Sequence, residues 1–312
     1  MRRVLVLVGP TASGKTAVSL PLARQLGGEI VSADSRQIYK FMNIGTAKPS
    51  PSERERIKHH FVDELSPDQD FNAGEFGRRG RMIVEDIFRR RKQPIVVGGS
   101  GLYVQSLVDG FFAGPSRDEA LRSTLYERIR RDGLTKLLKE LRTVDPQTAS
   151  KVLPSNTRRI VRALEVYYLT GIPISQHHRE QQDARTWEPV MFGLAWNRDV
   201  LYDRIDARVR RMIRQGLVKE VRALLSRGFD PSLNALQTVG YREVCQYLEG
   251  SIDRARMLEL MMQNSRRFAK RQLTWFRRDK RIRWLAVRSE KEFREIVDEI
   301  MRQFCAEDPP SN

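Results

Sequence analysis

Cysteine is scarce in this sequence, with only Cys245 and Cys305 among 312 residues and no Cys-x-x-Cys pair. Two distant cysteines exclude a disulfide framework and a cysteine-rich zinc site, and they suit a reducing cytoplasm, which is the expected location. Long apolar stretches able to cross a bilayer are also lacking. The apolar run at residues 4–8 is short, so we expect neither a signal peptide nor a membrane partner.

Acidic residues are outnumbered, because 39 Asp and Glu face 56 Lys and Arg and leave a formal net charge of +17. Such an excess does not fit an enzyme that acts only on small metabolites. It predicts a polyanionic partner, and nucleic acid is the first candidate. A hydrophobic content of 40% is typical of a globular protein, here with one large core or two moderate ones.

A phosphate-binding loop stands out among the features that are present. Residues 4–8 read Val-Leu-Val-Leu-Val and predict a buried strand, and Gly-x-x-x-x-Gly-Lys-Thr follows at residues 9–16, before a helical pattern. The glycines let backbone N–H groups approach an anion, Lys15 adds a cation, and the Thr16 hydroxyl can bind Mg²⁺. A diphosphate or triphosphate is therefore predicted to bind here. The expected contacts are Gly9, Thr11, Ala12, Ser13, Gly14, Lys15 and Thr16.

Asp34 directly follows a second predicted strand at residues 28–33. The carboxyl ends of strands in a doubly wound sheet line the ligand crevice, so we expect Asp34 beside the phosphate loop. Its carboxylate then faces whatever the diphosphate is attached to. A helix N-cap is an equally good interpretation of this aspartate.

A third predicted strand, at residues 94–97, ends in Gly98-Gly99-Ser100. A P-loop ATPase normally carries an aspartate at the end of such a strand to hold Mg²⁺. Glycines stand there in this chain, followed by a hydroxyl. The site thus keeps a phosphate cradle without the usual hydrolysis equipment, which indicates a diphosphate leaving group rather than a transferred phosphoryl group.

The order of the predicted elements indicates an α/β protein with a P-loop-containing parallel-sheet core and helices on both faces. Apolar residues at helical spacing, without a convincing strand, predict an inserted all-helical subdomain at residues 117–185. The core then comprises residues 1–116 and 186–305, and a disordered tail is expected at 306–312. Residues 41–72, rich in proline, serine and charge, are expected to form an elaborated surface loop.

The most basic stretch spans residues 264–283, where nine Lys and Arg face a single acid, Asp279. Basic groups contact phosphates, and interleaved aromatic rings stack on unpaired bases, a combination used for single-stranded RNA loops. Trp275 and Phe276 are equally well interpreted as core residues of the same helix.

The phosphate loop, the segment at 33–39 and the turn at 98–103 together resemble the tRNA dimethylallyltransferase (tRNA isopentenyltransferase) family of bacteria. The resemblance covers essentially the whole chain. Its further matches lie at residues 44–49, 159–166, 239–243 and 269–277. Ser100 departs from the family pattern, in which threonine is more usual, but the hydroxyl is retained.

The resemblance implies transfer of a dimethylallyl group from dimethylallyl diphosphate to N6 of the adenosine on the 3′ side of the tRNA anticodon. Asp34 is the implied general base, and Lys15 and Ser100 complete the catalytic set. Arg208 is implied as a further diphosphate contact, with a surface ion pair to Asp203 or Asp206 as the alternative. Mg²⁺ held at Thr16 is the implied cofactor.

The implied partners are dimethylallyl diphosphate and the anticodon stem-loop of tRNA, gripped by the helical insertion, and the chain is expected to act as a monomer. The implied tRNA contacts are Asp34, Ser35, Arg36, Gln37, Ser100, Arg122, Arg159, Arg162, Gly240, Tyr241, Arg242, Lys270, Arg271, Trp275 and Arg277. Three alternatives stay open: a small-molecule or nucleoside kinase, an RNA-binding P-loop ATPase, and an adenylate isopentenyltransferase acting on free nucleotides.

Overall fold

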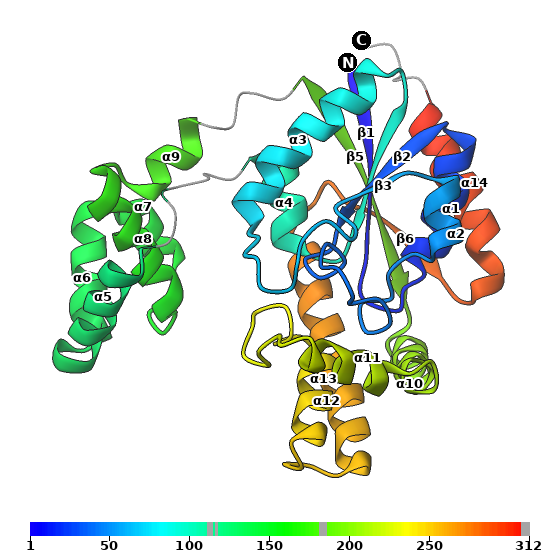
Figure 1. Ribbon diagram of the computed structural model, residues 1–312. Helices are drawn as coiled ribbons and strands as arrows, with labels where there is room; N and C mark the ends of the chain where they lie inside the picture. Colours follow the sequence, from blue (N-terminus) through cyan, green and yellow to red (C-terminus); the bar gives the residue numbers. More distant parts are fainter. Residues whose placement is uncertain (111–114, 116–117, 181–185, 307–312) are drawn as a thin grey trace. The chain divides into compact units, whose positions relative to one another are not determined.

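The computed structural model describes residues 1–110, 115, 118–180 and 186–306. Its strands form one parallel sheet in the order β3-β2-β4-β1-β5-β6 (Figure 1). The strands are β1 (Arg2–Val8), β2 (Gly28–Ala33), β3 (His59–His60), β4 (Gln93–Gly98), β5 (Trp187–Trp196) and β6 (Arg283–Val287). Residues 4–8 of β1 are fully buried. A strand covered on both faces needs apolar side chains at every position, which explains the continuous run of Val and Leu.

The register places the carboxyl ends of the central strands level with one another. Val8 of β1 pairs with Gly98 of β4, and Gly98 also pairs with Ala33 of β2. The residues that follow these three strands are Gly9, Gly99 and Asp34. Three sequence-distant segments therefore leave the sheet at the same edge.

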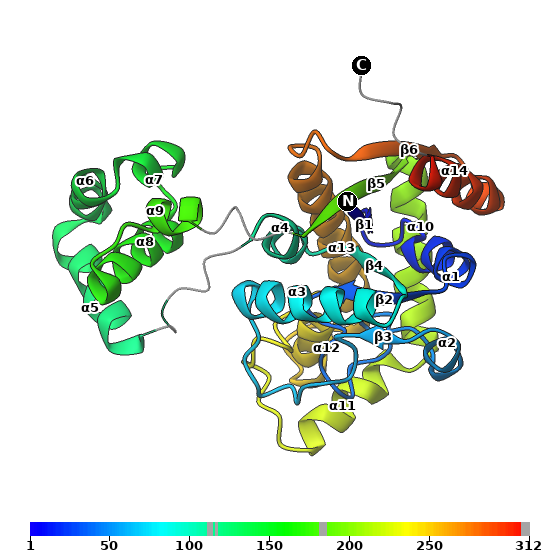
Figure 2. The ribbon, with the colours of Figure 1, turned by 90° about the horizontal axis from the view of Figure 1, so that it is seen from above.

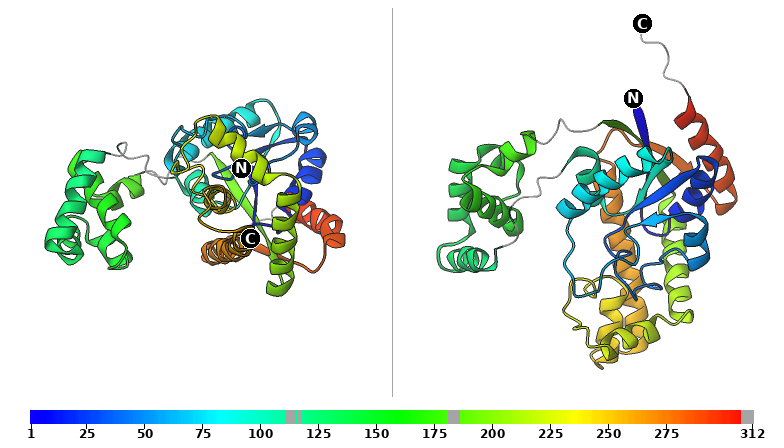
Figure 3. Two further views of the ribbon diagram at one scale, coloured as in Figure 1. Left: turned by 60° about the horizontal axis from the view of Figure 1, so that its bottom comes forward. Right: turned by 45° about the horizontal axis from the view of Figure 1, so that its top comes forward.

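Nine helices of the described residues surround this sheet or continue from it. They are α1 (Lys15–Gln25), α2 (Pro51–Arg56), α3 (Ala73–Arg89), α4 (Gly101–Asp109), α10 (Arg198–Arg214), α11 (Leu217–Ser226), α12 (Tyr241–Leu248), α13 (Arg254–Phe276) and α14 (Phe293–Cys305). Helices α1 and α14 lie on one face of the sheet and α3 on the other (Figure 2). Helices α10 to α12 lie beyond the carboxyl ends of the strands (Figure 3).

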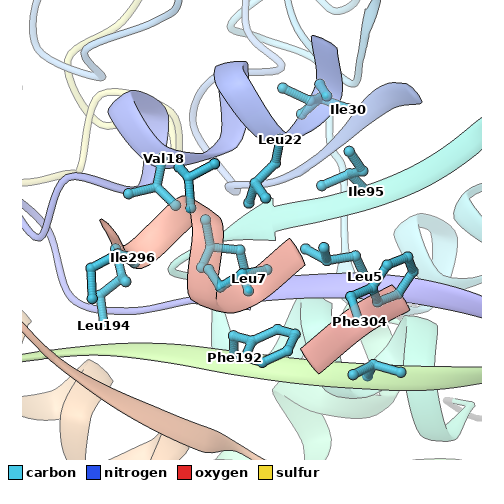
Figure 4. Close-up of a cluster of buried hydrophobic side chains, with 14 of the residues drawn as sticks. Leu5, Leu7, Val18, Leu22, Ile30, Ile95, Phe192, Leu194, Ile296 and Phe304 are labelled. Carbon is cyan, nitrogen blue, oxygen red and sulfur yellow. The ribbon is translucent and has the colours of Figure 1, made fainter. Parts of the chain in front are cut away.

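The principal core lies between the sheet and the helix pair α1 and α14. Val18 and Leu22 of α1 and Phe304 of α14 meet Leu5 and Phe192 of the sheet (Figure 4). These side chains come from β1, β5, the first helix and the last helix. The C-terminal helix is therefore part of the fold that carries the phosphate loop.

The chain divides into two compact units, of which the first holds the sheet. The second comprises residues 73–78 and 105–185 and, in its described part, contains no strand. Its helices include α5 (Glu119–Asp132), α6 (Leu134–Val144), α7 (Pro146–Lys151), α8 (Thr157–Thr170) and α9 (Ile174–Glu180). Within it, Leu125, Leu137, Leu141 and Leu164 form a separate core.

The predicted fold class is confirmed: a parallel sheet carries helices on both faces. The residues predicted as an insertion fall in the second unit, which also includes residues 73–78 and 105–116. From residue 307 on, the predicted tail lies outside the described residues. The prediction of a surface loop at 41–72 is wrong in part, because α2 and β3 form there and Met42 and Phe61 are buried. None of the described helices combines the length and apolar character needed to cross a membrane.

We expect Phe192→Ala to destabilise the first unit, because the ring is fully buried between β1 and α14. The loss of packing and the cavity left behind should lower the free energy of unfolding by about 3–5 kcal/mol in urea denaturation. Val200→Ala, at an exposed position of α10, is the control and should change it by less than about 0.5 kcal/mol. Equal effects of the two substitutions would contradict this account of the core.

Candidate active site

The phosphate loop joins β1 to α1 in a conformation that depends on Gly14. This residue caps α1 at a φ of 90°, in the left-handed region. A Cβ added there would lie 2.1 Å from Cζ of Phe293, so a side chain would both strain the backbone and collide with the ring. The loop can therefore present its N–H groups at the start of α1 only with glycine at this position.

Three side chains from other elements hold consecutive residues of this loop. The Thr11 N–H donates to Oε1 of Gln272 at 2.8 Å. Nε of Arg204 donates to the Ala12 carbonyl at 2.9 Å, and Nε1 of Trp196 donates to the Ser13 carbonyl at 2.9 Å. Arg204 also stacks over the Trp196 ring, 4.1 Å from its centroid. The backbone of the cradle is thus fixed from outside.

Two cations and one carboxylate meet beside the cradle. Lys15 donates to the Gly9 and Pro10 carbonyls at 2.9 and 2.7 Å. Burial and the neighbouring Arg208 guanidinium lower the pKa of Lys15 to about 7, against the opposing effect of Asp34. Burial also lowers the pKa of Arg208, again opposed by Asp34.

Arg208 makes no hydrogen bond or ion pair with any residue that the structure describes. The alternative pairing with Asp203 or Asp206 does not form, and Asp206 instead accepts from Arg266 at 3.2 Å. A half-buried guanidinium without a partner, next to a second cation, favours the binding of an anion. Arg208 therefore lies where a diphosphate contact is expected.

Asp34 lies in a turn after β2 and lines one cavity together with Lys15, Thr16 and Gly98. One carboxylate oxygen accepts the Arg36 N–H at 2.9 Å. No helix begins at this residue, so the N-cap interpretation is wrong and the turn bond takes its place. The second oxygen, Oδ2, has no hydrogen bond to the described residues and is available to a ligand.

The side chains next to Asp34 are engaged in holding its turn. Oγ of Ser100 accepts the Ser35 N–H at 3.1 Å and lies 3.3 Å from Oγ of Ser35. Arg36 donates to the Asn234 carbonyl at 2.8 Å. The Gln37 amide accepts from Ser32 and donates to the carbonyls at 46 and 47. Both ends of the Gln37 amide are therefore engaged inside the protein, and its contact with tRNA stays a prediction.

Tyr241 and Gly240 lie inside the protein rather than on its surface. The Tyr241 side chain is fully buried and its hydroxyl donates to Glu220 at 2.6 Å. The Gly240 N–H donates to Glu243 at 2.7 Å. Neither group is available to tRNA, which contradicts the expected contacts at Gly240 and Tyr241. Arg242 is partly exposed and pairs with Glu243.

Helix α13 carries the first part of the basic stretch, which continues beyond the helix from its C-cap, Arg277. Lys270, Arg271 and Arg277 are exposed, in keeping with the predicted RNA contacts. Phe276 is buried in the core, so its interpretation as a base-stacking ring is wrong. Trp275 packs against Gly101, where an added Cβ would lie 2.2 Å from the indole.

Two of the three arginines predicted to bind tRNA in the second unit have internal roles in that unit. Arg122 and Arg162 both donate to the fully buried Glu165, at 2.9 and 2.8 Å. Arg159 is exposed at the start of α8. Their contact with tRNA stays a prediction.

Sequence reasoning missed two of the residues that hold the loop. Gln272 lies in the segment 264–283, whose positive charge was the feature that drew attention, and Trp196 is the last residue of β5. A signal for Gln272 exists: it is a polar residue on the helix face that buries Ala269 and Phe276. The contacts themselves join residues more than 180 positions apart and leave no local pattern.

A magnesium ion fits this site only with ligands from a bound phosphate. The described residues contain no group of three or more His, Cys, Asp or Glu arranged to hold a metal. Thr16 lines the cavity and offers a hydroxyl. Mg²⁺ commonly takes one or two protein oxygens and completes its shell with phosphate oxygens and water.

A family model, curated relatives and solved structures all match this chain to transferases of the same kind. A family model described as IPP transferase matches residues 37–279. The tRNA dimethylallyltransferase of Pelotomaculum thermopropionicum is 45% identical over 305 residues, 97% of this chain and 96% of that protein. The full-length tRNA isopentenylpyrophosphate transferase of Bacillus halodurans has a TM-score of 0.71 at 37% identity and covers 96% of both chains. A eukaryotic dimethylallyltransferase acting on tRNA has a TM-score of 0.81 at 27% identity, over 97% of this chain and 79% of that one.

We expect the binding of inorganic diphosphate to take up a proton through Lys15. Without a bound anion the Lys15 amine has a pKa of about 7. A bound anion raises this pKa, so the affinity for diphosphate should fall as the pH rises above about 7. Calorimetry at about pH 8 in buffers of different ionisation enthalpy measures this uptake. Lys15→Met is the matched control, since protonation of diphosphate itself is common to both proteins. Equal proton uptake by the two would contradict the assignment.

Proposed function

The chain belongs to the IPP transferase family, and from this premise we propose that it transfers a dimethylallyl group from dimethylallyl diphosphate to N6 of the adenosine 3′-adjacent to the tRNA anticodon. Family membership makes it an enzyme of prenyl transfer to tRNA; the position of the adenosine and the steps below are part of the proposal. The observation that carries them is the Asp34 carboxylate in one cavity with Lys15, close to Arg208. The products are N6-isopentenyladenosine and diphosphate.

Asp34 acts as the general base in this proposal. The exocyclic amine of adenine is a weak nucleophile because its lone pair is delocalised into the ring. As the new N6–carbon bond forms, the amine proton passes to the free carboxylate oxygen of Asp34. Its other oxygen stays bonded to the Arg36 N–H, which keeps the carboxylate oriented.

The cradle stabilises the leaving group. When the allylic carbon–oxygen bond breaks, its electron pair stays on the diphosphate oxygens. Lys15, Arg208 and the N–H groups at the start of α1 stabilise that charge. The Thr16 hydroxyl would hold Mg²⁺, which would supply further neutralisation of that charge.

A kinase or ATPase is less consistent with the end of β4. A Cβ added at Gly98 would lie 2.1 Å from the Ala33 carbonyl oxygen, so an aspartate does not fit there. If the acceptor were a free adenine nucleotide, the net charge of +17 would have no role in substrate binding. A tRNA acceptor whose adenine is flipped out of its stack accounts for the charge, and a diphosphate leaving group needs no aspartate at the end of β4.

The experiment that tests this function follows the label of dimethylallyl diphosphate into unmodified tRNA or AMP, with Mg²⁺ present. Label in tRNA supports the proposal, and label in AMP alone would overturn the substrate assignment. ATP turnover with no label in either acceptor would favour a kinase. The expected location in the cytoplasm and a monomeric state stay predictions.

Asp34→Asn should slow prenyl transfer by about 10²–10⁴-fold, because the amide keeps the turn bond but cannot accept the proton. The affinity for tRNA should stay near that of the unsubstituted chain. Single-turnover rates and tRNA binding by filter retention separate the two effects. A large loss of tRNA affinity with an unchanged rate would make Asp34 a structural residue of the turn.

Substitution of Lys270, Arg271 or Arg277 by alanine should weaken tRNA binding and flatten its salt dependence. Each lost phosphate contact should reduce the slope of log affinity against log salt by about one unit. Arg302→Ala on α14, also an exposed arginine, is the control for loss of charge alone. A slope that matches the control would remove α13 from the interface.

A further inference from the structure

Gln272 projects from α13 into the space between two loops of the site. Its side chain is almost fully buried, with 7% of the residue exposed. Its Oε1 accepts the Thr11 N–H of the phosphate loop at 2.8 Å, and its Nε2 donates to the Gly99 carbonyl at 2.9 Å. One amide thus bridges residues that follow two different strands.

We propose that Gln272 is a positioning residue that fixes the spacing between the diphosphate cradle and the turn that carries Asp34, an inference that rests on the proposed function. The bridge continues beyond Gly99. The next residue, Ser100, accepts the Ser35 N–H and donates its own N–H to the Ala33 carbonyl. A continuous path of backbone and hydrogen bonds therefore runs from Thr11 through Gln272 and Ser100 to the residues on either side of Asp34.

The other braces of the cradle do not perform this task. Arg204 and Trp196 bond only the phosphate loop among the two loops in question. Their loss would loosen the cradle without altering its distance from the Gly99 turn. Gln272 is the member of the trio that bonds both loops, and both ends of its amide are used.

The fit around the amide leaves little freedom. A Cβ built on Gly99 would lie 2.3 Å from Nε2, so glycine at this position is what lets the amide reach the carbonyl. An apolar side chain at 272 would leave the Thr11 N–H and the Gly99 carbonyl without these partners. The two loops would then be free to shift relative to each other.

Prenyl transfer depends on this spacing because the carbon must lie between the departing oxygen and the N6 amine. A displacement of about 1 Å can cost on the order of 10²-fold in rate. The affinity for tRNA does not depend on it, because the exposed cations of α13 are unchanged. The position of Gln272 thus bears on chemistry and on diphosphate binding.

The first test compares Gln272→Met, close in length and without the amide, with Thr274→Ala on the same helix, whose hydroxyl bonds only the Lys270 carbonyl. We expect Gln272→Met to lower kcat by about 10²-fold and to weaken inorganic diphosphate, with tRNA affinity and melting temperature near those of Thr274→Ala. A kcat and a diphosphate affinity equal to those of the control would overturn the proposal. An equal fall in active fraction, melting temperature and tRNA binding would show a merely structural role.

The second test disturbs the same contact from its other side. Gly99→Ala pushes the flexible end of Gln272 away from the carbonyl and leaves the rest of α13 intact. If both substitutions act through one hydrogen bond, the double variant should be no slower than the slower single variant. Rate losses that multiply would overturn the proposal. The affinity for inorganic diphosphate is measured separately from prenyl transfer. If the unsubstituted chain does not prenylate tRNA, the proposed function is refuted, and the diphosphate affinities of the variants still test the Gln272 bridge.

Discussion

The site depends on positive charge that the protein leaves unbalanced. Lys15 and Arg208 lie close enough for one to lower the pKa of the other, and Asp34 is the carboxylate whose charge acts on both. Half-buried cations next to each other cost free energy through desolvation and repulsion, and an anion with several negative charges recovers it. The hydrogen bonds to the Thr11 N–H and the Ala12 carbonyl hold the backbone of the cradle in place despite that repulsion.

Parallel strands then explain why the acid and the cradle face each other at a distance. In the order β2-β4-β1, Asp34 follows a strand that lies two positions from the phosphate loop. Strands are spaced about 4.8 Å apart, so the gap is on the order of 10 Å. The intervening strand ends in Gly98 and Gly99, which add no side chains of their own, and the Gln272 amide reaches the Gly99 carbonyl there. A leaving group on one side and a proton acceptor on the other suit group transfer between two bound substrates.

Local patterns predicted the parts of this site that lie next to one another in the chain. The phosphate loop and the placement of Asp34 follow from glycine spacing and from apolar runs of strand length. Tyr241 was misjudged because a motif does not say whether a side chain faces solvent, and here Glu220 holds its hydroxyl inside. The short strands β3 and β6 and the bridge made by Gln272 depend on contacts across the fold, for which the sequence has no short-range signal.

Some of the basic residues that make up the excess positive charge stabilise the fold by pairing with buried carboxylates. Glu29 is buried and accepts from Arg90 and Lys92, and hydrogen bonds from Arg90 hold its pKa well below the usual range. Glu165 likewise forms ion pairs with two arginines, Arg122 and Arg162. Each such carboxylate neutralises one of two cations, so these buried clusters raise the net charge while they stabilise the fold. Because the potential around a protein sums all charges, these cations also contribute to the long-range attraction of a polyanion. The net charge therefore measures the long-range field of the whole chain, and it does not identify the cations that contact RNA.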